Sequence, residues 1–215
     1  GVYVKQDCSV NADVITAPDG TDSADYMQEN TNFGRHRISQ PGIAVVSSSS
    51  YTASVYAKSS TRNLMINANS IFNARSTFSL TGDGSVLQTD SGSATITNVG
   101  NGWYRCTVTG TPTASGTGTV FYQAQDGITD SQYQGDGTSG IYLWGGQVEA
   151  GPYAGDYART TNAGASSARD VAFLPDGNGN FVSAGELLLE EAKTNLIKES
   201  EDFVTLWSPD TEFTF

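Results

Sequence analysis

The fold is decided by residues 51–58, which read Tyr51-Thr52-Ala53-Ser54-Val55-Tyr56-Ala57-Lys58. Tyr51, Ala53, Val55 and Ala57 fall on one face of an extended chain. The intervening residues Thr52, Ser54, Tyr56 and Lys58 fall on the other face. This period of two is typical of a half-buried β-strand, whose successive side chains point to opposite faces.

The same signal recurs outward from this stretch, and the segments are separated by turn sequences such as Gly82-Asp83-Gly84 and Gly100-Asn101-Gly102. No helical period is convincing before residue 160, so we expect antiparallel strands without helical crossovers. The sequence therefore predicts an all-β, antiparallel, jelly-roll-like β-sandwich over residues 1–160. The further predicted strands are 24–29, 35–40, 63–68, 76–80, 94–99, 103–109, 118–125 and 139–149.

A C-terminal extension is expected over residues 161–215. It begins as a linker rich in Thr, Ala, Ser and Asn. Residues 173–181 predict a short hairpin, and Glu186–Lys198 predicts a helix, although Leu187–Leu189 also fits a strand. The last residues form a candidate docking tail because their apolar surface should pack on something. Its aromatic residues are Phe203, Trp207, Phe213 and Phe215.

The charge balance excludes several classes of partner. The chain has 23 acidic and 11 basic residues, a net charge of −12. Nucleic acid and anionic membranes are disfavoured because both require clustered Lys and Arg. No apolar run is long enough to insert in a membrane. Neutral sugars, basic partners and cations remain open, although the acidity also fits a role in solubility alone.

Enzyme and zinc chemistry find no support in the residue pattern. His36 is the single histidine, and no catalytic motif of known spacing is present. Cys8 and Cys106 either pair or remain free thiols, and no cysteine–histidine cluster suggests zinc. We therefore expect no enzymatic activity and no required cofactor. Because the chain begins with Gly1, we expect it to be processed or a fragment.

Four segments carry a family resemblance in order: residues 17–25, 51–58, 102–110 and 135–151. Together they resemble the carbohydrate-binding-module-like, concanavalin-A-like sandwich domains of bacteriophage tail and fibre proteins. The resemblance implies a virion protein exposed to the extracellular medium. Residues 185–196 and 200–203 look like the lead-in that precedes such a domain, which implies a slice of a longer, tandem-module protein.

A sugar site needs an aromatic plate for the ring and planar polar groups for the hydroxyls. Trp103, Arg105 and Thr107 share one strand face with that mixture, and Tyr56 joins them if its strand lies in the same sheet. Tyr122 and Gln123 are further candidates. In the alternative interpretation, Trp103 packs under a loop and Arg105 pairs with a carboxylate. Trp144 belongs to a stretch that is apolar on both faces, so it is interpreted as core.

A structural calcium ion is a weaker candidate, since sugar-binding modules of the jelly-roll type often hold one. Asp19, Asp25 and Glu149 could supply the oxygen ligands that calcium prefers. A second acidic cluster comprises Asp126, Asp130 and Asp136. Both sets are equally well interpreted as solvated loop carboxylates.

Three functional hypotheses follow. The first is a non-catalytic virion adhesin module that binds host-surface carbohydrate through repeated, weak contacts. The second is a structural or decoration module without a ligand, which docks on other virion proteins through its tail. The third is a carbohydrate-binding module of a secreted polysaccharide-degrading enzyme. A homo-oligomer is compatible with each hypothesis, although no heptad repeat argues for one.

Overall fold

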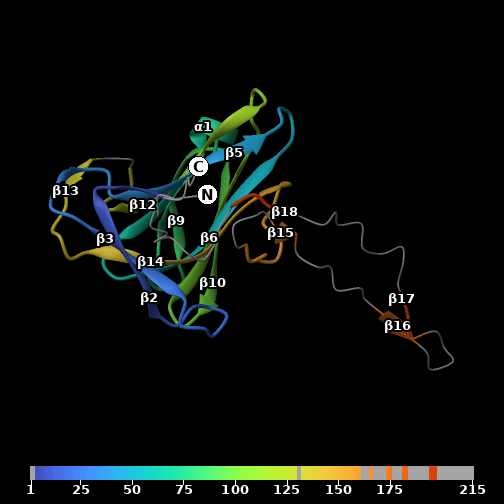
Figure 1. The fold of residues 1–215 in the computed structure, drawn as a ribbon, viewed down its shortest axis with the longest axis horizontal. Helices are drawn as coiled ribbons and strands as arrows, with labels where there is room; N and C mark the ends of the chain where they lie inside the picture. The colour runs from blue at the N-terminus through green and yellow to red at the C-terminus, as the bar shows by residue number, and fades with distance from the viewer. Residues whose placement is uncertain are drawn as a thin grey trace, which may run out of the picture.

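The chain folds as an all-β sandwich of two six-stranded antiparallel sheets packed face to face (Figure 1). The structure is a computed structural model. It describes residues 3–129, 132–160, 165–166, 173–175, 181–183 and 194–197. The predicted all-β antiparallel sandwich is confirmed.

Sheet A has the strand order β1-β5-β12-β7-β8-β9. Its register shifts within the β5–β12 and β8–β9 pairs. The strands are β1 (Val4–Gln6), β5 (Arg37–Val45), β12 (Gly116–Gln125), β7 (Asn63–Asn67), β8 (Arg75–Ser79) and β9 (Ser85–Ser91).

Sheet B has the strand order β10-β11-β6-β14-β3-β2. The regularly alternating residues 51–58 belong to β6, which lies in the middle of this sheet between β11 and β14. The strands are β10 (Ser93–Gly100), β11 (Trp103–Gly110), β6 (Tyr51–Ser59), β14 (Gly140–Ala150), β3 (Ala24–Glu29) and β2 (Cys8–Ile15).

Shorter elements decorate the sandwich. β4 (Phe33–Gly34) pairs with β13 (Tyr133–Gln134). The one-turn helix α1 (Asn69–Phe72) ends at Asn73, whose φ of 52° is left-handed. Asparagine tolerates this conformation better than most residues, so it can terminate the helix. The described part of the chain holds no helix long and apolar enough to cross a membrane.

The main core lies between the two sheets. In β6 the predicted inward residues Tyr51, Ala53, Val55 and Ala57 are all buried. The inward face of β11, formed by Tyr104, Cys106 and Val108, packs in the same core. Both alternation patterns are therefore confirmed, because each places its apolar side chains between the sheets.

A second apolar cluster lies on the outer face of sheet B. It contains the buried residues Ala17, Ala24, Trp103 and Trp144. Tyr56, Tyr142, Tyr157 and Ile15 pack against them. The cluster is buried because two segments cover the outer face of the sheet. One is the loop between β2 and β3, and the other follows β14 and includes Tyr157.

The described parts of the extension comprise short strand pairs and one docked segment. The predicted hairpin is present as β16 (Phe173–Pro175) paired with β17 (Phe181–Ser183). Residues 186–193 of the predicted helix lie outside the described residues, and its next two residues instead form strand β18 (Thr194–Asn195), paired with β15 (Ala165–Ser166). The helix prediction is therefore wrong at its C-terminal end.

Asn195 fixes this segment to the sandwich. Its side-chain amide donates to the carbonyl oxygens of Gly146 and Ala158, at 3.3 and 3.0 Å, and its Oδ1 accepts the backbone N–H of Val148 at 3.1 Å. Ile197 is fully buried in the main core. The candidate docking tail, Phe203, Trp207, Phe213 and Phe215, lies outside the described residues.

Candidate functional site

The predicted face of β11 exists, and β6 adds to it as expected. Arg105 lies opposite Tyr56 in the register of the two strands, on the outer face of sheet B. Lys58 follows on the same face and donates from Nζ to the carbonyl oxygen of Asn101 at 2.9 Å. Three of the predicted sugar-binding residues, Tyr56, Trp103 and Arg105, are therefore neighbours.

Trp103 is covered and cannot act as an exposed plate. Only 2% of its surface is accessible, and its Nε1 donates to the carbonyl oxygen of Thr16 at 3.1 Å. Trp144 lies in the same cluster, with its Nε1 donating to the hydroxyl of Ser23 at 3.0 Å. Both indoles lie beneath the loop between β2 and β3. The interpretation of Trp103 as packing under a loop is confirmed, and Trp144 is buried as predicted.

Tyr122 and Gln123 do not join this face, because they belong to β12 in sheet A. Tyr122 is fully buried between the sheets, and burial raises the pKa of its hydroxyl far above the ordinary value. Gln123 is also fully buried. These two residues are therefore left out of the site proposed below.

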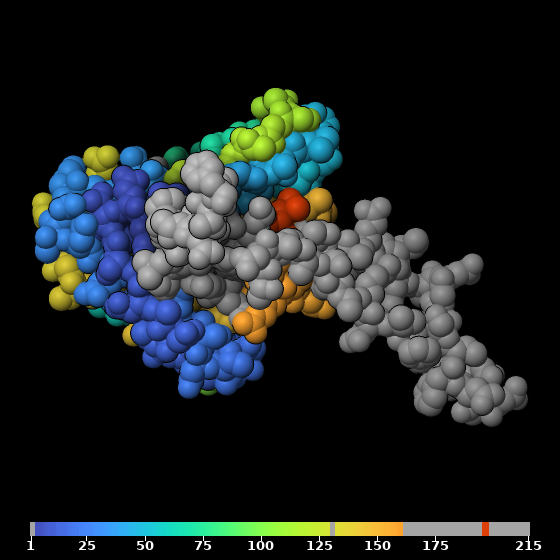
Figure 2. Space-filling model, in the orientation of Figure 1, coloured from blue at the N-terminus to red at the C-terminus, as the bar shows by residue number. Residues whose placement is uncertain are grey.

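A segment that we call the strap, residues 151–158, crosses the outer face of sheet B. In Figure 2 its orange atoms border the blue N-terminal part of the chain. The N–H of Gly155 donates to Glu149 Oε1 at 2.7 Å, and the carbonyl oxygen of Gly155 accepts from Arg105 Nη2 at 2.6 Å. The N–H of Ala158 donates to Gln147 Oε1 at 2.9 Å. The strap is thus fastened to β14 and β11.

A β-bulge in β14 makes this fastening possible. The register with β6 shifts between Trp144 and Gln147, where Gly145 adopts a φ of 62°. One extra residue reverses the alternation of side chains. As a result Gln147 and Glu149 return to the outer face that Trp144 occupies. There Glu149 accepts the strap's N–H and a hydrogen bond from Gln147 Nε2 at 2.9 Å.

Between the strap and β10–β11 lies a cavity of about 220 Å³, which we call the Arg105 groove. Its floor is formed by threonine side chains of β10 and β11, which we call the hydroxyl ladder. Within it Thr95 lies opposite Thr107, and their Oγ1 atoms are 2.7 Å apart. Its wall includes Tyr153, which is 50% exposed. The lining residues are Ser93, Ala94, Thr95, Thr97, Arg105, Thr107, Thr109, Pro152, Tyr153 and Ala154.

Arg105 is held in place while much of its hydrogen-bonding capacity stays unused. Nη2 donates to the carbonyl oxygen of Gly155 and, at 3.5 Å, to the hydroxyl of Ser54, and the guanidinium carbon lies 5.3 Å from the centre of the Tyr56 ring. Nε has no hydrogen-bond partner among the described residues. No carboxylate of the described residues forms an ion pair with Arg105, so the alternative interpretation is wrong on this point.

Sequence reasoning missed Tyr153, the aromatic residue of the groove. It follows Gly151-Pro152, a turn signal directly after the last predicted strand. That signal marks a loop, but it does not reveal that the loop folds back over sheet B. The contacts of Gly155 and Ala158 hold this loop over sheet B, where Tyr153 lines the same cavity as Thr95 and Thr107.

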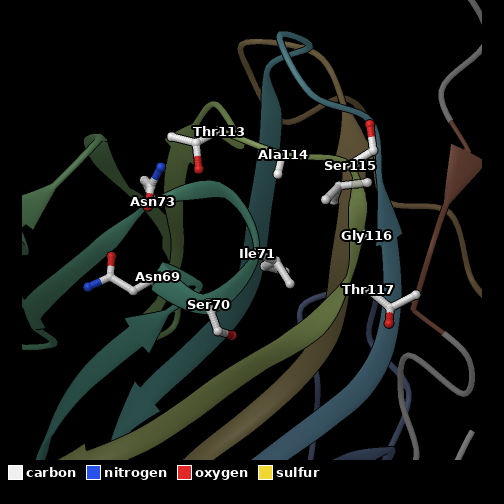
Figure 3. Close-up of a pocket in the computed structure, with 10 residues that line it drawn as sticks. Asn69, Ser70, Ile71, Asn73, Thr113, Ala114, Ser115, Gly116 and Thr117 are labelled. Atoms are coloured by element: carbon white, nitrogen blue, oxygen red, sulfur yellow. The ribbon is translucent and has the colours of Figure 1, made fainter.

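A second cavity of similar volume, about 220 Å³, lies between α1 and the start of β12 (Figure 3). It is lined by Asn69, Ser70, Ile71 and Asn73 on one side and by residues 113–117 on the other, with Val45 alongside. Ser70 Oγ already donates to the carbonyl oxygen of Thr119 at 3.1 Å. The lining has no charged and no aromatic side chain, so this cavity lacks the sugar-stacking surface of the Arg105 groove.

The calcium candidates lie in separate places. Asp19 accepts hydrogen bonds from the N–H and hydroxyl of Thr21, at 2.9 and 2.7 Å. Asp25, which is buried on β3, accepts a hydrogen bond from the backbone N–H of Asp13 on β2. Glu149 accepts the N–H of Gly155 in the strap. Among the described residues, no group of three or more His, Cys, Asp or Glu could hold a metal ion. A calcium ion stays a prediction.

The second acidic cluster is engaged by Arg62. Its guanidinium binds buried Glu29 through Nε and Nη2, at 2.9 and 2.8 Å, and lies 3.1 Å from Asp126 and 3.4 Å from Asp136. Tyr133 donates its hydroxyl proton to Glu29 Oε2 at 2.7 Å. Asp130 lies outside the described residues. We call Glu29, Arg62, Tyr133, Asp126 and Asp136 the Arg62 cluster.

The histidine and one of the two cysteines are fully buried, and the other cysteine, Cys8, is partly buried. His36 is fully buried, with Nδ1 2.6 Å from the carbonyl oxygen of Asp7 and its ring packed on that of Tyr133. Cys8 and Cys106 are free thiols. Burial raises the pKa of Cys8 to about 11 and that of Cys106 well above its ordinary value, which disfavours the reactive thiolate in both.

No protein-family model matches this chain, and no curated protein matches it.

Proposed function

We propose that this chain is a non-catalytic module that binds host-surface carbohydrate in the Arg105 groove. The observation that carries the proposal is the composition of the groove: a half-exposed tyrosine, a ladder of threonine hydroxyls and a fixed guanidinium line one cavity. The ring of Tyr153 offers apolar contact to a sugar face, and the other groups are suited to hydroxyls.

The biological setting rests on the resemblance of residues 1–160 to sandwich domains of phage tail and fibre proteins. We propose that the module is part of a virion adhesin, exposed to the extracellular medium and assembled with other virion proteins. A shallow groove of this size favours modest affinity for one site. Repeated copies on a particle would raise the avidity without any new contact.

The test is binding of the whole chain, displayed as a multimer, to a glycan array and to isolated bacterial cell surfaces. We expect binding that Tyr153→Ala reduces at least about tenfold, because the stacking surface is lost. Phe33→Ala is the matched control, since Phe33 is a 67% exposed aromatic on β4 and does not line the groove. Absence of binding by the multimer, or an equal loss in both variants, would contradict the proposal.

A further inference from the structure

We infer that the Arg105 groove selects sugars that carry a carboxylate, such as uronic or sialic acids, and that Arg105 binds this group. The inference rests on the proposed function and specifies its ligand class. The starting observation is that the ten lining residues include one cation and no carboxylate. The chain as a whole has 23 acidic and 11 basic residues, so the lining differs in sign from the average of the molecule.

Other arginines of the same protein show what this environment lacks. Arg62 pairs with Glu29, Asp126 and Asp136, and Arg75 pairs with Asp90 at 2.8 Å. Arg105 is partly withdrawn from solvent without such compensation from the described residues. A partly desolvated cation without a counter-charge costs free energy. A ligand carboxylate would supply the missing charge.

The guanidinium is also oriented in advance. A guanidinium offers five N–H donors, and both hydrogen bonds of Arg105 to Gly155 and Ser54 leave from Nη2. Gly155 and the Tyr56 ring fix the plane, so Nη1 is available to a ligand without much further loss of side-chain freedom. Thr97 lies directly across from Arg105 in the β10–β11 register, so its hydroxyl borders the same position.

The charge of the whole molecule sharpens the inference. With a net charge of −12, the protein repels polyanions in general. Preference for an acidic over a neutral glycan must therefore arise from a local contact. A single guanidinium matches the single negative charge of a sugar carboxylate, with which it can form charge-assisted hydrogen bonds.

The test compares acidic glycans with charge-free counterparts. The probes are polygalacturonate, alginate, hyaluronan and polysialic acid, each against its methyl-esterified form, with dextran sulfate as a general polyanion. For at least one pair, we expect the whole chain to bind the acid form about tenfold or more tightly than the ester. Arg105→Gln should remove this preference, because the glutamine amide carries no charge.

Lys58→Gln is the matched control, because it changes the net charge equally on the same face of sheet B but outside the groove. It should keep the preference for the acid form, and Arg105→Lys should keep part of it. Thermal unfolding of each variant verifies the fold. If Arg105→Gln does not fold, two other variants test the role of Arg105. The inference predicts that Arg105→Lys keeps part of the preference for the acid form and that Thr97→Glu loses it. The opposite results would contradict the inference.

The outcomes separate this inference from the proposed function. Binding of neutral glycans with no preference for the acid form would overturn the inference and leave the proposed function standing. Binding of no glycan at all would overturn both. Equal binding of dextran sulfate and the uronates would overturn selection of a carboxylate, and an unchanged preference in Arg105→Gln would overturn the role of Arg105.

Discussion

Arg62 and Arg105 show how one residue type serves two different ends in this sandwich. Arg62 is surrounded by Glu29, Asp126 and Asp136, and its hydrogen bonds tie the end of β3 to the loops after β12. Arg105 touches a backbone carbonyl, a hydroxyl and an aromatic ring, and it lines an open groove. The first arginine is neutralised within the protein, whereas the second forms no ion pair with the described residues, and we propose that a ligand supplies its counter-charge.

The contrast shows that the role of an arginine side chain depends both on its burial and on whether a carboxylate pairs with it. Glu29 is fully buried at the side chain and Arg62 is 14% exposed there, so each depends on the other for compensation. The Arg105 groove contains no acid that could play the part of Glu29. We therefore expect changes at Arg62 to affect folding and changes at Arg105 to affect binding.

The largest expected effect is that of Arg62→Ala. This substitution leaves the buried carboxylate of Glu29 without its cation, which should lower the free energy of unfolding by about 3–5 kcal/mol. Arg75→Ala is the control, because the Arg75–Asp90 pair is more exposed and should cost about 1 kcal/mol or less. Urea denaturation measures both. Similar losses of unfolding free energy in the two variants would contradict the claim that Glu29 depends on Arg62 for its counter-charge.

The pH dependence of stability should report the same cluster. Burial alone would raise the pKa of Glu29, but hydrogen bonds from Arg62, the N–H of Asp136 and Tyr133 bring it below the ordinary value of 4.5. The resulting stability is present above the unfolded pKa and is lost as the pH falls through the lower folded pKa.

Glu29→Gln lacks this titration. Its free energy of unfolding should therefore decrease less than that of the wild type on acidification from pH 5 to about pH 3. Urea denaturation at a series of pH values measures the two slopes. Parallel curves for the two proteins would show that Glu29 does not carry the effect.

Arg105→Gln should change the free energy of unfolding by only about 1 kcal/mol. The change removes a hydrogen bond to the carbonyl oxygen of Gly155, and it leaves no buried carboxylate of the described residues unpaired. The same urea series used for Arg62→Ala provides the comparison. A loss as large as that of Arg62→Ala would mean that Arg105 is primarily a fastening for the strap.

The smallest effect on stability is expected from Thr97→Glu, which places a carboxylate opposite Arg105 in the β10–β11 register. A cross-strand ion pair at this exposed position should stabilise the fold by a few tenths of a kcal/mol, about 0.2–1. It should also abolish binding of carboxylate glycans, because Arg105 would then resemble Arg62. Thr97→Gln, without the charge, should retain binding. Unchanged binding by Thr97→Glu would show that the ligand does not bind at Arg105.

The strands were predictable wherever alternation is regular. The residues predicted to face inward, Tyr51, Ala53, Val55 and Ala57 in β6 and Tyr104, Cys106 and Val108 in β11, all lie in the main core. β2 and β9 were missed for a physical reason: β2 contains the left-handed residue Asp13 and a register shift, and β9 is mostly polar with two shifts against β8. The periodic signal is broken in both.

The site was only partly predictable. The face that carries Arg105 and Tyr56 follows from the period of two. Burial of Trp103 does not follow, because the covering loop is distant in sequence and its contact with Thr16 depends on tertiary packing. The position of Tyr153 depends on the strap, which in turn depends on the bulge at Gly145. No local pattern encodes these long-range contacts.

The most direct test of the ligand site is NMR titration of the labelled chain with an oligosaccharide of a uronate or sialate that it binds. We predict that the resonances of the Arg105 side chain, Thr107 and Tyr153 shift together and saturably, while those of Arg62 and Phe33 stay unchanged. Shifts confined to the cavity beside α1, around Asn69 and Asn73, or to the Arg62 cluster would contradict the assignment of the site to the Arg105 groove.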